Sequence, residues 1–131
     1  MALQNSEPKK VLLVCAPECT RVEGRLLHAG CRVTKVAQGT AAVEGIKHGA
    51  VNAVVLISTG SEMDLTETAL NLRDVNASVE IIILADRESA EGKKHEANTI
   101  AHVIPKTKVL TTSQLDDYLK SARWKAKPSA H

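Results

Sequence analysis

The chain has 131 residues, a length typical of one domain, and its seventeen basic and fifteen acidic side chains leave a net charge of only +2. This balance does not indicate a nucleic-acid surface, and one Trp, one Tyr and no Phe argue against base stacking on an aromatic platform. No apolar run approaches the length of a membrane span, and the polar N-terminus lacks a signal-peptide core. Three cysteines without a pairing pattern are typical of reduced thiols in a cytoplasmic protein.

In chain order, the first half contains three predicted strands, each followed by a predicted helix. The runs Lys10–Cys15 and Asn52–Ile57 are apolar without alternation, which is typical of strands buried on both faces. Cys31–Ala37 alternates apolar and polar residues and should therefore lie near an edge of the sheet. Gly30 should cap the preceding helix in the left-handed conformation. The predicted helices cover residues 17–27, 40–49 and 65–73, and Thr40 should cap the second of them.

The second half continues the same alternation. Glu80–Ala85 is a fourth apolar strand, and Ala101–Ile104 is predicted to be a short fifth strand. Between them, a polar helix is predicted to open at Asp86–Ser89 and to end near Asn98, and Thr112 or Ser113 should cap the last helix. Five strands alternating with five helices predict an α/β fold, a three-layer α/β/α sandwich around a parallel sheet with right-handed crossovers. We expect a leader over residues 1–8, one domain over residues 9–124 and a tail over residues 125–131.

Several segments match a known order and spacing. Lys9–Val14 reads as a first strand, Ala29–Val33 as a G-y-e-V segment and Ala37–Val43 as an A-x-x-G-x-e-A turn. From Lys9 to about Arg123 the chain resembles the receiver domain of response regulators in two-component signalling. That resemblance implies a flavodoxin-like, or CheY-like, (βα)5 fold with a five-stranded parallel sheet in the order 2-1-3-4-5. Further matching positions are Met63, Asp64, Arg73, Ile81–Leu84 and Lys106.

The resemblance also implies where the family's phosphorylation chemistry should lie. Receiver domains place an acidic pair for Mg²⁺ after the first strand, a phosphate-accepting aspartate after the third, a Ser or Thr after the fourth and a lysine after the fifth. A carboxylate attacks phosphorus only where cations offset the crowded negative charge. Here only the lysine position matches, and a shift of one residue would put a serine at the acceptor position. The resulting degenerate pocket comprises Cys15, Ala16, Ile57, Ser58, Ala85 and Lys106.

An enzymatic alternative starts at Cys15. The segment from Cys15 to Arg21 has the spacing C-x5-R between a strand and a helix, which is the layout of the phosphate loop in low-molecular-weight tyrosine phosphatases. Pro17 removes one backbone N–H from such a loop, and Glu18 places a negative charge where the phosphate would bind. These residues favour the simpler interpretation that Cys15 packs in the sheet. The cysteine and histidine spacings predict no metal site, and we expect no cofactor.

Our interpretation is therefore a pseudo-receiver, a receiver-like module that is not an enzyme and regulates protein partners without phosphorylation. Another alternative is an anion or small-ligand sensor that uses Lys106. Receivers contact partners mainly through the fourth helix, fifth strand and fifth helix, and the partner here would be another protein or a second copy of the chain. By this family analogy, the predicted interaction face contains Lys93, Lys94, His95, Val103, Lys108, Leu115 and Tyr118.

Overall fold

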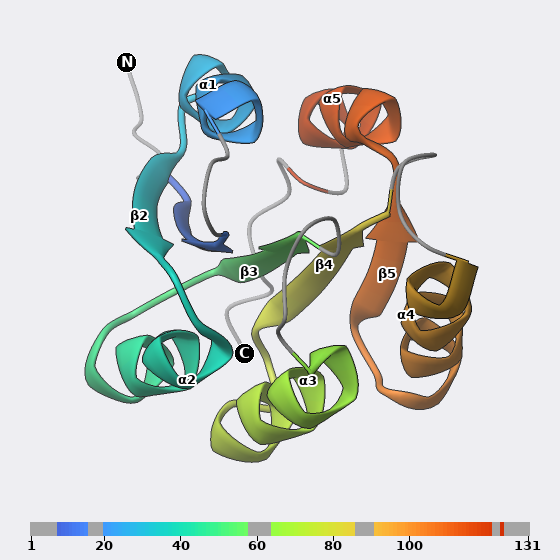
Figure 1. Ribbon diagram of the computed structural model, residues 1–131. Coiled ribbons are helices and arrows are strands. Elements are labelled where there is room, and N and C mark those ends of the chain that lie inside the picture. Colours follow the sequence, from blue (N-terminus) through green and yellow to red (C-terminus); the bar gives the residue numbers. More distant parts are fainter. Residues whose placement is uncertain (1–7, 16–19, 58–63, 86–90, 122–123, 125–131) are drawn as a thin grey trace.

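The structure, a computed structural model, describes residues 8–15, 20–57, 64–85, 91–121 and 124 (Figure 1). In these ranges five parallel strands form one sheet in the order β2-β1-β3-β4-β5, which confirms the predicted fold. The strands are β1 (Lys10–Val14), β2 (Arg32–Val36), β3 (Ala53–Ile57), β4 (Glu80–Leu84) and β5 (Thr107–Leu110). The helices are α1 (Thr20–His28), α2 (Gly39–His48), α3 (Leu65–Val75), α4 (Glu91–Val103) and α5 (Thr112–Lys120).

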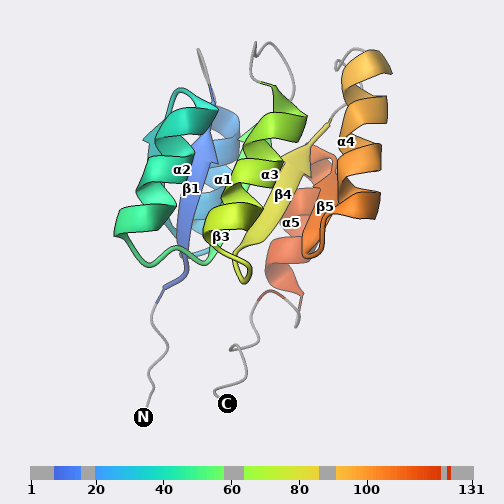
Figure 2. The same ribbon diagram turned by 90° about the horizontal axis from the view of Figure 1, so that it is seen from below.

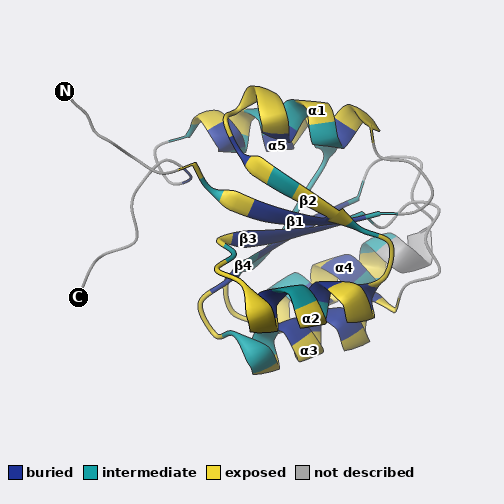
Figure 3. Cartoon of the chain, turned by 90° about the vertical axis from the view of Figure 1, so that its left-hand side faces the viewer, coloured by how far each residue is buried: buried dark blue, intermediate teal, exposed yellow. Residues whose placement is uncertain are grey.

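Helices cover both faces of the sheet. Helices α2, α3 and α4 lie on one face, whereas α1 and α5 lie on the other, as Figures 1 and 2 show from two directions. The central strands β3 and β4 are buried along nearly their whole length because helices cover both of their faces (Figure 3). Strand β2 lies at the edge of the sheet and is largely exposed, as its alternating pattern predicts.

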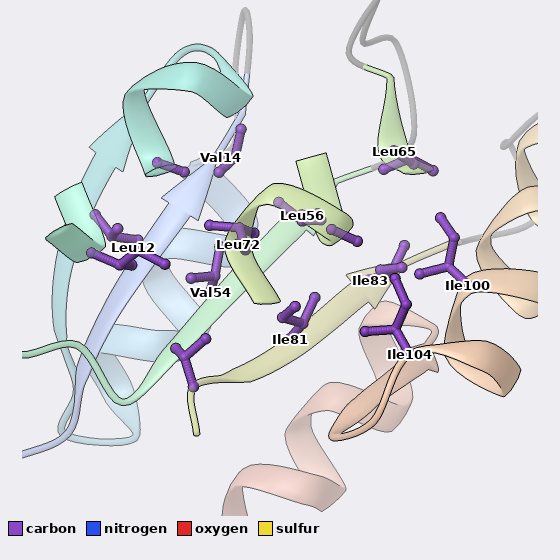
Figure 4. Packing of buried hydrophobic residues seen from close by; sticks show 14 of the residues in the cluster. Leu12, Val14, Val54, Leu56, Leu65, Leu72, Ile81, Ile83, Ile100 and Ile104 are labelled. Atoms are coloured by element: carbon purple, nitrogen blue, oxygen red, sulfur yellow. The ribbon is translucent and has the colours of Figure 1, made fainter. Parts of the chain in front are cut away.

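Alternate residues of the buried strands pack into two separate apolar cores, one on each face of the sheet. On β1, for example, Leu12 packs in the core under α2, α3 and α4, whereas Leu13 packs in the core under α1 and α5. Figure 4 shows the first of these cores, in which Ile100 and Ile104 approach β4 from the α4 side. The apolar strands without alternation therefore supply both cores at once.

The boundary between the fourth helix and the fifth strand is a correction to the sequence prediction. Ala101–Ile104 is not a strand, because α4 continues to Val103 and β5 begins only at Thr107. The physical reason is that Ala97, Ile100 and Ile104 recur at helical spacing and are all buried on the same side of α4. Pro105 follows directly and disfavours a further helical turn.

The predicted cap was correct for one helix, whereas two other helices begin at a different residue than predicted. Gly30 has a φ of 89° and ends α1 in the left-handed conformation, as predicted. The last helix is capped by Thr111 rather than Thr112 or Ser113, and Gln114 completes a capping box with it. Helix α2 begins at Gly39, one residue before the predicted cap Thr40. Residues 1–7, 16–19 and 125–131, which include Pro17 and nearly all of the predicted leader and tail, lie outside the described ranges.

A close approach between α2 and α3 gives the first testable prediction. A Cβ atom added at Gly39 would lie 2.3 Å from the Oγ1 atom of Thr68, a buried residue of α3. Gly39→Ala should therefore lower the free energy of unfolding by about 1–3 kcal/mol, the usual cost of overpacking. Thr68→Ala removes the two closest atoms, so the double variant should be more stable than the sum of the single effects predicts. Urea denaturation of the three variants measures this.

Gly24 provides the matched control because it is also a helical glycine. A Cβ atom added there meets no heavy atom within 4 Å. Gly24→Ala should raise the free energy of unfolding by about 0.5–1 kcal/mol through helix propensity alone. If Gly39→Ala stabilises the protein as Gly24→Ala does, the close packing of α2 on α3 is contradicted.

Candidate functional site

The sheet brings three of the predicted pocket residues together. Cys15 directly follows β1, Ile57 ends β3 and Ala85 directly follows β4. Neighbouring strands pair in register up to these ends, so the three residues lie at the same carboxyl edge of the sheet. The Cys15 N–H donates to the Val36 carbonyl at 3.0 Å, and the Ala85 N–H donates to the Leu110 carbonyl at 2.9 Å. Strand pairing thus continues one residue past β1 and β4.

The described side chains at this edge supply no set of ligands for a divalent cation. Cys15 and Ile57 pack against the core under α1 and α5, and Ala85 carries only a methyl group. Within the described part of the chain, no three His, Cys, Asp or Glu side chains gather where a metal ion could bind. The carboxylate of Asp64 accepts a hydrogen bond from the Glu67 N–H at 3.0 Å and so caps α3. The hard oxygen ligands that Mg²⁺ requires are therefore missing from the described edge. Ala16 and Ser58 lie outside the described residues.

The position predicted for Lys106 is wrong. Because β5 begins at Thr107, Lys106 precedes the fifth strand and lies at the amino edge of the sheet, opposite to Cys15 and Ala85. Its carbonyl accepts hydrogen bonds from the Ile81 N–H at 3.0 Å and from Arg73 at 3.2 Å. Its φ of 56° lies in the left-handed region. Lys106 therefore cannot act as the pocket lysine or as part of an anion site there.

Thr111 is the residue that follows the fifth strand. Its hydroxyl oxygen accepts a hydrogen bond from the Gln114 N–H at 3.1 Å, and its own N–H donates to the Gln114 side chain at 2.9 Å. Both groups are thus used to cap α5. At the position where the resemblance places a lysine, the structure therefore has a neutral capping residue.

The cysteines differ in state, which corrects the prediction of three reduced thiols. Cys15 is disulfide-bonded, whereas Cys31 is a free cysteine in the core under α1 and α5. A sulfur in a disulfide is not a nucleophile, so the phosphatase alternative would first require reduction of Cys15. Burial raises the pKa of the Cys31 thiol, which makes that residue less reactive as well. Arg21 of the C-x5-R segment is exposed on α1.

The predicted interaction face is only partly exposed. Leu115 is completely buried in the core under α1 and α5, so its assignment to the face is wrong. Leu115 and Leu119, four residues apart, are the buried residues of α5. Val103 is exposed, but it lies on α4 and not on the fifth strand. His95 is exposed and Lys94 is partly exposed on α4, and the structure does not describe the side chain of Lys93.

The two remaining face residues belong to a network at the amino edge of the sheet. The Lys108 ammonium lies 3.2 Å from a Glu80 carboxylate oxygen and 4.0 Å from the centre of the Tyr118 ring. The Tyr118 hydroxyl donates to the same Glu80 oxygen. Lys108 and Tyr118 are therefore already engaged with Glu80, and they fasten α5 to β4 and β5.

Sequence reasoning missed two polar contacts between α3 and α4. The Glu96 carboxylate of α4 accepts hydrogen bonds from the Thr66 N–H at 3.2 Å and the Thr66 hydroxyl at 2.7 Å. At the other end of α3, Arg73 donates to the Pro105 carbonyl at 2.7 Å. No local pattern indicates these contacts, because each joins residues about thirty positions apart.

Comparison with solved structures identifies the fold. The structure is similar to the receiver domain of a sensor histidine kinase from Pseudomonas aeruginosa PAO1, with a TM-score of 0.70, 22% identity and coverage of 92% of this chain and 100% of that chain. A response regulator receiver protein from Sinorhizobium medicae matches with a TM-score of 0.63, 23% identity and coverage of 86% and 94%. A CheY-like receiver domain from Methanospirillum hungatei matches with a TM-score of 0.65, 13% identity and coverage of 87% and 92%.

These similarities show that the chain has the receiver, or CheY-like, fold. The sequence itself matches no protein-family model, and no curated protein matches it significantly. The P. aeruginosa domain coordinates a magnesium ion in its active-site cleft. The residues described at the corresponding edge of this chain do not fit such an ion. Among the helices that the structure describes, none is long and apolar enough to cross a membrane.

Proposed function

We propose that this chain is a pseudo-receiver, a regulatory module of signal transduction that binds protein partners without being phosphorylated and is not an enzyme. One observation carries the proposal. At the carboxyl edge of the sheet, where receivers hold their phosphate, this chain has Cys15, Ile57 and Ala85.

The physical argument concerns charge. Transfer of a phosphoryl group to a carboxylate needs a nucleophilic carboxylate and a cation that offsets the negative charge of both groups. Ile57 supplies no nucleophile, and a disulfide-bonded Cys15 supplies neither a carboxylate nor a thiolate. With Lys106 at the opposite edge, the ammonium is absent from the described pocket as well. Partner binding and abundance are then the available means of control, and we expect the module to act in the cytoplasm.

The exposed residues that remain for a protein partner lie on α4 and around β5. His95 and Lys94 offer polar groups on α4. Lys108 keeps about a quarter of its side-chain surface exposed, at 27%, beside Glu80 and Tyr118. This proposed face therefore differs from the sequence prediction by the loss of Leu115.

The proposal is tested by titrating the ¹⁵N-labelled protein with Mg²⁺ and then with beryllofluoride, the mimic of an aspartyl phosphate. We expect no saturable shifts in the backbone amides of Cys15, Ile57 and Ala85. A receiver domain with an intact acidic pocket, measured in the same buffer, is the positive control. Saturable shifts at these amides would show that a phosphate-responsive pocket survives, and the proposal would then be wrong.

A further inference from the structure

Two large apolar side chains are exposed on neighbouring helices. Leu70 of α3 is 52% exposed and Val103 of α4 is 70% exposed. Both helices lie on the same face of the sheet (Figure 1). A third exposed leucine, Leu27, is 53% exposed, but it lies on α1, on the other face of the sheet. Leu70 and Val103 are therefore candidates for one shared surface.

Contacts at both ends of the helix pair place these two residues along one seam. The hydrogen bonds from Thr66 to Glu96 join the start of α3 to α4, and the hydrogen bond from Arg73 to the Pro105 carbonyl joins the end of α3 to the end of α4. The two helices therefore run side by side in the same direction. Leu70 lies one helical turn after Thr66, and Val103 lies two turns after Glu96, so both side chains border the seam.

Opposite charges flank this apolar pair at matching separations in the sequence. Glu67 lies three residues before Leu70 on α3, and Lys106 lies three residues after Val103. Both charged residues are exposed. Asp74, also exposed on α3, adds a second carboxylate on the α3 side of the seam. The seam therefore has the Glu67 and Asp74 carboxylates on α3, the Glu96 carboxylate bound to Thr66 on α4, and the basic Lys106 beyond the end of α4.

The apolar pair and its flanking charges would be complementary to the same surface on a second copy of the chain. A twofold axis through the seam would place α3 of one copy antiparallel to α4 of a second copy. Leu70 would then meet Val103 of the second copy. Because Glu67 lies near the start of α3 and Lys106 lies in the turn after α4, this antiparallel arrangement would bring Glu67 toward Lys106 of the second copy. Each contact would occur twice.

We propose that the chain forms a homodimer through this α3–α4 seam, with Leu70 and Val103 at its centre and the Glu67–Lys106 pair at its rim. A second copy is favoured over an unrelated partner because the charges of one copy complement those of another without any further surface. The seam shares Val103 of α4 with the face under Proposed function, but dimerisation through the seam does not depend on whether the pocket at the carboxyl edge binds phosphate. With two apolar side chains from each copy at its centre, the interface is small, and a weak dimer is expected.

Sedimentation velocity of the full chain tests the proposal, from about 10 µM to about 1 mM, the range in which weak interfaces become half-populated. The wild-type weight-average mass should rise toward that of a dimer. Val103→Asp and Leu70→Asp should each raise the dissociation constant at least about tenfold, because each places two like charges at the centre of a symmetric interface. Leu27→Asp, with the same exposed fraction on α1, should leave it unchanged.

Charge reversal tests the pairing itself. Glu67→Lys and Lys106→Glu should each weaken the dimer, and the two substitutions in one chain should restore it because the pairs re-form with opposite sign. Thermal melts of each variant check that the fold is retained. A wild-type chain that stays monomeric at the highest concentration would overturn the proposal. A dimer that the seam substitutions leave unchanged, or that Leu27→Asp weakens equally, would also overturn it.

Discussion

Replacing Trp124 by alanine is expected to lower the free energy of unfolding by about 3–5 kcal/mol, the usual cost of truncating a buried large aromatic side chain. Trp124 is only 4% exposed and packs in the core under α1 and α5. The centre of the Trp124 ring lies 5.8 Å from the centre of the Tyr118 ring and 4.7 Å from the Lys9 ammonium. The residue thereby joins the segment after α5 to the start of β1. Urea denaturation monitored by far-UV circular dichroism measures the effect.

Two control variants distinguish the loss of Trp124 packing from a general loss of stability. Trp124→Phe keeps an aromatic ring and should cost less than Trp124→Ala. Leu27→Ala, at an exposed site of α1, should change the free energy of unfolding by no more than about 0.5 kcal/mol. If Trp124→Ala costs as little as Leu27→Ala, the packing of Trp124 beneath the sheet is contradicted.

The same residue marks the predicted end of the domain. A chain that ends at Trp124 should keep the stability of the full chain, whereas a chain that ends at Ser121 should lose about as much as Trp124→Ala. This comparison directly tests the domain boundary predicted at residue 124. Equal stability of the two shortened chains would place the boundary before Trp124.

Replacing Arg73 by alanine is expected to lower the free energy of unfolding by about 2–4 kcal/mol, because four hydrogen bonds from a charged donor are lost and such bonds are worth more than neutral ones. The Arg73 guanidinium donates to four backbone carbonyls. Two belong to the turn between α3 and β4, and two belong to the turn between α4 and β5. The acceptors, with their distances, are Asn76 at 3.0 Å, Val79 at 2.7 Å, Pro105 at 2.7 Å and Lys106 at 3.2 Å.

The surroundings of Arg73 explain why its geometry matters more than its charge. Burial lowers the pKa of Arg73, and its Nε atom is buried without a hydrogen-bond partner. The Arg73 guanidinium donates to backbone carbonyl oxygens of two turns, so its planar fork is needed to reach both turns at once. Arg73→Lys keeps the charge but not the fork, and it should recover less than half of the lost stability. A lysine variant as stable as the wild type would show that charge alone suffices.

Both substitutions also bear on the proposed function. Arg73 and Trp124 fasten loops and the C-terminal segment at the amino edge of the sheet, away from Cys15, Ile57 and Ala85. Their variants should therefore leave the amide shifts at the carboxyl edge unchanged while lowering stability. The two ends of the sheet can thus be probed separately.

The sequence by itself determined the layered architecture, and it supplies the residue identities on which the proposed loss of phosphorylation chemistry rests. Apolar runs such as Asn52–Ile57 and Glu80–Ala85 have too little polar character for a surface strand, so they predict a parallel sheet covered on both faces. Position 57 is an isoleucine, which has no carboxylate however the chain folds. Periodicity and residue identity are local properties, which is why these predictions needed no contacts.

The tertiary structure alone decided where α4 ends, and with it the location of Lys106. Ala101–Ile104 is too short for its periodicity to distinguish a strand from a helix, and only its packing against β4 resolves the choice. Moving the start of β5 to Thr107 transfers Lys106 to the opposite edge of the sheet. The hydrogen bonds from Arg73 to Pro105 and from Thr66 to Glu96 likewise join residues about thirty positions apart, and a local sequence pattern does not indicate contacts that form only when the chain has folded.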